Sequence, residues 1–198
     1  MARQTAISIN TIPIGPLGII GMPGCEELTD KIDKYLVKWR KTQASEHAES
    51  IAFFGYQRDT YKIDVSIPRF GSGEGKGVIN ESVRGYDIYI VCDVFNYSCS
   101  YDMYGRKVYM SPDDHFADLK RVISALCSKP KRVSVIMPML YEGRQHKRSS
   151  RESLDCAMAL KELVHLGVEN IITFDAHDQR VQNAIPDKSF ENVCRLTR

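Results

Sequence analysis

Apolar and polar positions alternate along the second half of the chain in a way that predicts strands and helices in turn. Three short apolar runs, YDIYIVCDV, RVSVIMPML and NIITFDAH, have the length and composition of buried strands. The two segments between them, SPDDHFADLKRVISALC and SLDCAMALKELVHLG, repeat apolar residues at helical spacing. Strands that alternate with helices of this length build a parallel sheet covered on both faces. From Tyr86 to His177 the pattern therefore predicts an α/β fold.

The part of the chain before Tyr86 predicts one helix and a less regular region. The segment CEELTDKIDKYLVKW opens with acidic residues and repeats apolar residues at helical spacing, which is typical of an amphipathic helix. Residues 40–50 are polar and predict a connection, whereas residues 51–67 predict strands up to the glycine cluster RFGSGEGKG. The apolar positions of the predicted helix are Leu28, Ile32, Tyr35, Leu36 and Trp39.

Capping residues place the ends of the two later helices. Ser111 followed by Pro112 is typical of a helix start, and Ser149 with Glu152 has the spacing of a capping box. Gly167 stands where a C-terminal cap is expected.

Length and composition indicate a globular chain with one domain or a tight pair, because 43% of its 198 residues are hydrophobic and 26% are charged. The net charge of +2 and the isoelectric point near 8.2 are far from the balance of a nucleic-acid-coating protein. We therefore expect no nucleic-acid partner, and any function of positive charge must be local.

Cysteine spacing and the N-terminal stretch indicate a cytoplasmic location. The six cysteines include no CxxC pair, which favours free thiols in a reducing compartment. The opening stretch is interrupted by Pro13, Gly15, Pro16 and Gly18, so it is too broken to span a bilayer or to direct export. We expect no membrane association.

Two unusual loops follow predicted strands, and a third precedes one. The sequence YEGRQHKRSSR leads from a strand into a helix, DAHD ends the following strand, and RFGSGEGK precedes another. Ligands of parallel α/β sheets bind at the carboxyl ends of the strands, so neighbouring strands would bring all three loops to one edge. The first loop carries five groups that are or can be cationic, which suits a phosphate. These groups are Arg144, His146, Lys147, Arg148 and Arg151.

Each loop also has a simpler interpretation. The cationic loop could be a solvated surface, and the three alternating glycines could form a flexible hairpin, since they match neither a dinucleotide fingerprint nor a P-loop. His177 could be a loop histidine whose acidic neighbours cap a helix. The alternative is a metal site, because Asp175 and His177 would point the same way from an extended chain.

Three ordered motifs together resemble the N-terminal half of ribose-phosphate pyrophosphokinases, the phosphoribosyl pyrophosphate synthetases. The motifs are RFGSGEGKGVINESVRGYDIYIV, VIMPMLYEGRQHKRSSRES and NIITFDAHDQRVQNAIP. We expect this N-terminal domain to cover residues 21–192, with an insertion at about 40–65 typical of a longer, divergent branch. Residues 1–20 then form an extension with the first strand, and residues 193–198 form a divergent tail.

The resemblance implies a fold and a reaction. In this family, two phosphoribosyltransferase-like (Rossmann-like) domains, each a parallel sheet flanked by helices, lie side by side. The enzyme transfers the β,γ-diphosphoryl group of ATP to the C1 hydroxyl of ribose 5-phosphate with Mg²⁺. By resemblance, Phe70, Ser72 and Glu74 hold the adenine and ribose of ATP across a subunit boundary, which implies a homo-oligomer. Arg144 and Gln145 match the arginine-glutamine pair beside the nucleotide.

The metal element and the departures from the family pattern complete the expected site. Asp175 and His177 match the family's magnesium-associated D-x-H element, although Mg²⁺ prefers oxygen, so we expect His177 to contact the ion weakly or through water. His146 stands where most members have aspartate, and we group it with the ATP contacts. Ser72 replaces a commoner Asp or Asn, so we expect altered nucleotide contacts at this position.

Lys147 and Arg148 are expected to serve the phosphate-binding loop. The second domain of the family is not recognisable in these 198 residues. That domain carries the acidic loop that cradles ribose 5-phosphate and the mobile cationic loop that stabilises the transferring group. The pair in SPDDHF is the only Asp-Asp sequence, and it reads as a helix N-terminus.

We therefore expect ATP to be the partner of this chain, and ribose 5-phosphate to bind only if the second domain is supplied. Three interpretations stay open: the ATP-side half of an enzyme that is inactive alone, a non-catalytic nucleotide-binding or assembly module, and a domain for another phosphorylated ligand.

Overall fold

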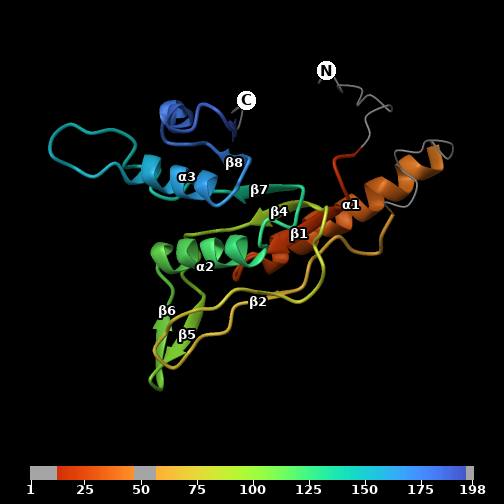
Figure 1. Cartoon of the computed structure of the whole chain (residues 1–198), viewed down its shortest axis with the longest axis horizontal. Helices are drawn as coiled ribbons and strands as arrows, with labels where there is room; N and C mark the ends of the chain where they lie inside the picture. The colour runs from red at the N-terminus through yellow and green to blue at the C-terminus, as the bar shows by residue number, and fades with distance from the viewer. Residues whose placement is uncertain (1–12, 47–56, 195–198) are drawn as a thin grey trace.

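A five-stranded parallel sheet forms the centre of the molecule in the computed structural model, which describes residues 13–46 and 57–194. The strand order is β1-β4-β7-β8-β9, and every neighbouring pair is parallel (Figure 1). The predicted α/β fold is confirmed. The strands are β1 (Leu17–Gly21), β4 (Asp87–Val91), β7 (Arg132–Met137), β8 (Asn170–Phe174) and β9 (Ser189–Val193).

In the part of the chain that the structure describes, three α-helices cover the sheet. The helices α2 (Pro112–Ala125) and α3 (Asp155–His165) share one apolar core with β4, β7 and β8, whereas α1 (Glu26–Glu46) packs with Ile19 and Val91 on the opposite side. Alternate residues of β1, β4 and β7 therefore supply two separate cores. Among the described residues, none of the helices is long and apolar enough to cross a membrane.

Smaller elements extend from this centre. The strands β2 (Val65–Ser66) and β3 (Val78–Ile79) pair antiparallel, as do β5 (Ser100–Met103) and β6 (Arg106–Tyr109). Figure 1 shows the β5–β6 hairpin standing away from the main sheet. A 3₁₀ helix, η1 (Gln179–Ala184), connects β8 to β9. The sequence patterns predicted neither the hairpin nor η1 and β9.

The region after α1 differs from the prediction. Residues 40–46 continue the helix instead of forming a connection, and of the expected strands at 51–67 the described part contains only β2 and a bridge between Ile19 and Lys62. This bridge extends the sheet, because the Ile19 N–H donates to the Tyr61 carbonyl and the Ile63 N–H donates to the Ile19 carbonyl, both at 2.8 Å. Part of the expected insertion, residues 47–56, lies outside the described residues.

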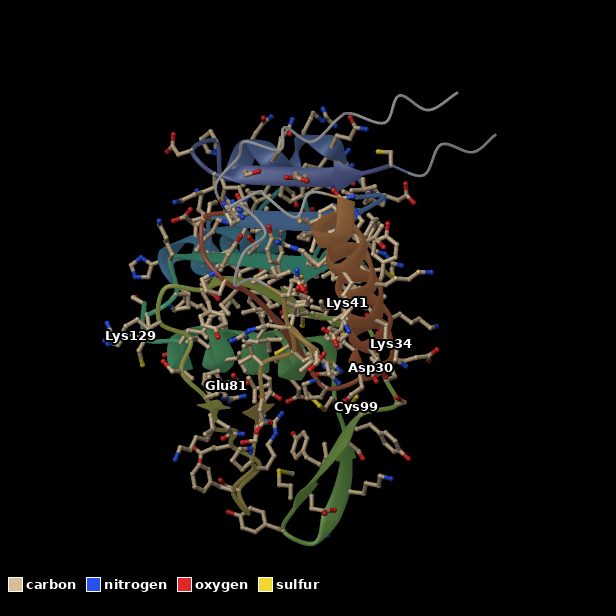
Figure 2. All side chains as sticks on the ribbon, turned by 90° about the vertical axis from the view of Figure 1, so that its right-hand side faces the viewer. Asp30, Lys34, Lys41, Glu81, Cys99 and Lys129 are labelled. Atoms are coloured by element: carbon tan, nitrogen blue, oxygen red, sulfur yellow. The ribbon has the colours of Figure 1, made fainter. Side chains whose placement is uncertain are left out.

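The helix α1 is also rotated relative to the apolar stripe in its sequence. Leu28 and Tyr35 are 41% and 68% exposed, while Thr29 and Asp33 are buried. The carboxylate of Asp33 accepts hydrogen bonds from the Thr60 hydroxyl at 2.9 Å and from the Tyr61 N–H at 2.7 Å. These bonds fix the polar side of α1 against the neighbouring segment. Figure 2 shows Asp30, Lys34 and Lys41 along the same helix.

The helix ends test the capping predictions. Ser111 begins α2 as predicted. It also forms a capping box with Asp114, with bonds of 3.2 and 2.9 Å between each side chain and the other's backbone N–H. Gly167 has φ +97°, and the Val168 N–H donates to the Leu163 carbonyl in a Schellman motif. The capping box expected at Ser149 is wrong, because α3 begins only at Asp155.

Candidate functional site

A pocket of about 440 Å³ lies at the carboxyl ends of β7 and β8. The segments 139–144 and 174–177 form most of its wall, and Phe95, Pro112 and Asp113 complete it. Two of the three unusual loops thus come together at the edge where parallel sheets bind ligands, as predicted.

The third loop, around Phe70, does not line this pocket. It lies against the β5–β6 hairpin and α2 instead. The Tyr104 N–H donates to the Gly71 carbonyl at 3.0 Å, and Arg69 forms an ion pair of 2.5 Å with Asp118 on α2. The Arg69 guanidinium also lies 4.4 Å from the centre of the Tyr101 ring. This loop therefore does not join the other two loops in the pocket of a single chain.

The turn from Phe70 to Glu74 is held by its own hydrogen bonds. The Phe70 N–H donates to the Glu74 carbonyl at 2.8 Å, and the Ser72 hydroxyl donates to the Glu74 carboxylate at 2.7 Å. The Phe70 side chain is 57% exposed. The turn thus presents an aromatic face to solvent, while Ser72 and Glu74 bond to each other.

Of the residues singled out in the cationic loop, Arg144 lines the pocket, whereas Gln145, His146, Lys147 and Arg148 do not. Arg144 is exposed and lines the pocket. The Gln145 side-chain amide donates to the Ser153 carbonyl at 2.8 Å, and the His146 ring lies 5.1 Å from the His177 ring. Lys147 and Arg148 are exposed and outside the pocket wall.

Asp175 and His177 both line the pocket, but not on an extended chain. The strand β8 ends at Phe174, and Asp175 has φ +46°, in the left-handed region. The expectation that Asp175 and His177 point the same way from an extended chain is therefore wrong. Within residues 13–46 and 57–194, no three His, Cys, Asp or Glu side chains converge as a metal cluster.

Carboxylates dominate another part of the wall. Burial raises the pKa of Glu142, and the negative charges of Asp155 and Asp113 raise it further. The Tyr141 hydroxyl donates to Asp113 at 2.7 Å, while its ring stacks on Phe116 with centroids 4.3 Å apart. Burial and this bond to a carboxylate raise the pKa of Tyr141. A cation beside these groups would be favoured.

Sequence reasoning missed Tyr141, Glu142 and Asp113 as parts of the pocket. Their positions in the sequence could have identified them. Tyr141 and Glu142 closely follow β7, and Asp113 lies in the first turn of α2, the helix between β4 and β7. The rule that selected the cationic loop also applied to them.

A parallel sheet with helices on both faces and a pocket at its carboxyl edge is the architecture of α/β domains, in which ligands commonly bind at that edge. Residues 17–167 match the family model for the N-terminal domain of ribose phosphate pyrophosphokinase. The chain belongs to the ribose-phosphate pyrophosphokinase family.

Relatives and a solved structure agree with this assignment. The chain is 28% identical over 138 residues to ribose-phosphate pyrophosphokinase 1 of Schizosaccharomyces pombe, a match that covers 69% of this chain and 30% of that protein. It is 27% identical over 122 residues to ribose-phosphate pyrophosphokinase of Vibrio parahaemolyticus, covering 60% of this chain and 34% of that protein. The phosphoribosylpyrophosphate synthetase of Mycobacterium smegmatis has the same fold, with a TM-score of 0.64 at 19% identity.

The structural match covers 90% of this chain and 48% of the Mycobacterium smegmatis chain. The matched region is about half the length of that structure and about a third the length of the curated relatives.

Proposed function

We propose that this chain carries the ATP side of a ribose-phosphate pyrophosphokinase, which forms AMP and phosphoribosyl pyrophosphate from ATP and ribose 5-phosphate. The observation that carries the proposal is the common pocket of Arg144, Asp175 and His177. A cationic side chain and a carboxylate at the carboxyl edge of β7 and β8 suit the phosphates and the divalent cation of a nucleotide.

In this proposal, each group has a physical role. Arg144 binds phosphate oxygens through its planar guanidinium, and the exposed ring of Phe70 stacks on the adenine. Because Phe70 does not line the pocket of its own chain, a nucleotide that contacts both residues takes Phe70 from a second copy. The functional form is then a homo-oligomer.

The pocket fits a hydrated Mg²⁺ ion better than a fully protein-bound one. Mg²⁺ keeps several waters and needs only one or two carboxylates besides substrate phosphates. Asp175 suits such a ligand, whereas the His177 ring lies beside His146 and suits contact through water. When bound, the ion would neutralise charge on the diphosphoryl group.

The residues for the acceptor are not recognisable in this chain. The only Asp-Asp sequence, at Asp113 and Asp114, belongs to the N-terminus of α2, where Asp114 caps the helix and Asp113 accepts from Tyr141. We therefore propose that this chain binds ribose 5-phosphate and turns over only when a second domain is present.

Calorimetric titration with ATP tests the proposal. We expect weak, Mg²⁺-dependent binding, and Arg144→Ala should cost about 1–3 kcal/mol because a charge-assisted contact is lost. Arg84→Ala is the matched control, since Arg84 is an exposed arginine outside the pocket wall and should change affinity little. Equal affinities of the wild type and Arg144→Ala, with both folded, would remove the pocket from the proposal.

A further inference from the structure

The turn from Phe70 to Glu74 is tied to helix α2 by the arginine that precedes it. The Arg69 guanidinium forms an ion pair of 2.5 Å with the Asp118 carboxylate on α2 and donates to the Gly73 carbonyl at 3.2 Å. Arg69 also forms an antiparallel β-bridge with Gly75, so the two residues that flank the turn lie opposite each other. One side chain therefore connects both the base and the interior of the turn to the helix.

The β5–β6 hairpin contacts the same arginine. The Arg69 guanidinium lies 4.4 Å from the centre of the Tyr101 ring, at a distance typical of a cation–π contact. The Tyr101 hydroxyl lies 3.5 Å from the Asp114 carboxylate in the first turn of α2, and the Tyr104 N–H donates to the Gly71 carbonyl at 3.0 Å. In Figure 1 the chain between β2 and β3 runs beside this hairpin, below α2. Turn, hairpin and helix thus meet at Arg69.

The meeting point is buried and charged. The side chains of Arg69 and Asp118 are 11% and 2% exposed, and Asp118 has a second partner within α2, Arg121, at 2.6 Å. Burial raises the pKa of Asp118, and the positive charges of Arg69 and Arg121 act against that rise. Because a buried ion pair seldom adds net stability over an apolar contact, its better-attested benefit is to fix the geometry of the elements that it joins.

The side chain that this base supports faces outward. The Phe70 ring is 57% exposed, and in the proposed function it stacks on the adenine bound by a second copy. We propose that Arg69 and Asp118 are positioning residues whose ion pair holds the Phe70 ring in place for the adenine base. The identity of the base rests on the proposed function, whereas the anchor is present in the chain without ligand.

Hydrogen–deuterium exchange of the chain without ligand tests the anchor. The Phe70 N–H and the Gly73 N–H donate within the turn to the Glu74 and Phe70 carbonyls, both at 2.8 Å, so their exchange reports opening of the turn. Arg69→Met should raise both exchange rates about three- to tenfold, as expected for the loss of one or two hydrogen bonds. Arg69→Lys keeps a charge beside Asp118 but has one nitrogen for two acceptors, so it should raise them about threefold.

Arg121→Met is the matched control. It also removes one arginine from Asp118, but from within α2, so the bonds of Arg69 to Asp118 and to the Gly73 carbonyl remain. Exchange in the turn should then stay within about twofold of the wild-type rate. Thermal unfolding shows whether each variant is folded, and Arg69→Lys decides if Arg69→Met is not. Unchanged exchange in the folded Arg69 variants, or an equal rise in Arg121→Met, would overturn the anchor.

Two ligands separate positioning of the ring from a general loss of structure. In the presence of Mg²⁺, ATP offers phosphates and adenine, whereas inorganic tripolyphosphate offers phosphates alone. Arg69→Met should weaken ATP binding about three- to tenfold and Arg69→Lys about threefold, while the affinity for tripolyphosphate stays unchanged. Neither variant should weaken ATP binding further in a Phe70→Ala background. Equal losses for ATP and tripolyphosphate would overturn the positioning role.

The wild-type chain separates failure of this proposal from failure of the proposed function. ATP should bind more tightly than tripolyphosphate if the adenine stacks on Phe70. Equal affinities for the two ligands, or binding of neither, would count against the proposed function. The exchange rates would then still decide whether Arg69 anchors the turn.

Discussion

At the scale of single residues, Glu142 places a carboxylate where its surroundings oppose a negative charge. Burial raises its pKa, and Asp155 and Asp113 raise it further. Its backbone also has φ +55°, a conformation that costs a non-glycine residue about 1 kcal/mol. Acidic residues with raised pKa values in pockets are typical of functional sites. We therefore propose Glu142, beside Asp175, as a further carboxylate that would attract the proposed cation.

The variant Glu142→Gln should make the domain more stable at neutral pH. A carboxyl group whose folded-state pKa exceeds its usual value of 4.5 binds its proton more tightly in the folded chain. Its stabilising contribution is complete below pH 4.5 and is lost as the pH rises through the folded-state pKa. Glutamine imitates the protonated form, so the gain at pH 7 should be below about 1 kcal/mol, because the side chain keeps contact with water.

Urea denaturation at pH 7 and pH 4 measures this difference. The gain should shrink at the lower pH, where Glu142 itself becomes protonated. A variant less stable than the wild type at pH 7 would show that the carboxylate has a stabilising role in the ligand-free pocket.

The position of the pocket could be predicted from sequence, but the directions of its side chains could not. The rule on carboxyl ends of strands located Arg144, Asp175 and His177 together. It could not show that His146 turns toward Asp178, since that contact joins two loops that are distant in sequence. Nor could it show that Asp175 leaves the extended conformation.

At the scale of elements, two serines with the same local sequence signal have different structural roles. Ser111 and Ser149 are each followed by an acidic residue three positions later. Ser111 caps α2 directly, whereas Ser149 bonds to Glu152 within a loop. The bond from Gln145 to the Ser153 carbonyl holds that segment as a loop, so α3 starts later.

Alanine at these two positions should therefore have unequal effects. Ser111→Ala should lower the free energy of unfolding by about 1 kcal/mol, because it leaves helical N–H groups of α2 without an acceptor. Ser149→Ala should change it by less than about 0.5 kcal/mol, as for an exposed surface substitution. Urea denaturation of both variants measures the comparison, and equal losses would contradict the assigned helix starts.

How well each strand or helix could be predicted from sequence depended on how it packs in the fold. The strands β4 and β7 are buried and strongly apolar, so their runs were recognisable. In the edge strand β9, exposed and half-buried residues alternate. Because it includes the polar residues Glu191 and Asn192, its sequence was not recognisable as a strand. The helix α1 was recognisable from its spacing, yet its rotation depended on the bonds of Asp33 to Thr60 and Tyr61.

At the scale of the whole molecule, large apolar side chains remain exposed on several of the described elements. Leu28 and Tyr35 lie on α1, while Phe174 and Val193 end β8 and β9 with 44% and 46% exposure. Single exposed apolar residues are ordinary, and only a contiguous apolar patch is typical of a surface that contacts other protein. Self-association stays a prediction that agrees with a nucleotide site completed by Phe70 of a second copy.

The last prediction concerns turnover by these 198 residues alone. Phosphoryl transfer depends on positioning both substrates and on neutralising charge in the transition state. The proposed function assigns Arg144 and Asp175 to the ATP side, but no acceptor cradle or second cationic loop is recognisable in the sequence. Loss of one such electrostatic element costs about 10²–10³-fold in comparable sites, and here two are missing together with the binding energy of the acceptor.

We therefore expect no AMP release from ATP, ribose 5-phosphate and Mg²⁺ by the purified chain, and recovery when the C-terminal domain of a family member is added as a separate chain. His177→Ala is the control for the metal side of the pocket, and it should weaken the recovered activity without unfolding the domain. Steady turnover by the chain alone that His177→Ala abolishes would show that the acceptor site is built from residues within this sequence. ATP binding without recovery by an added domain would favour a nucleotide-binding or assembly module over half of an enzyme.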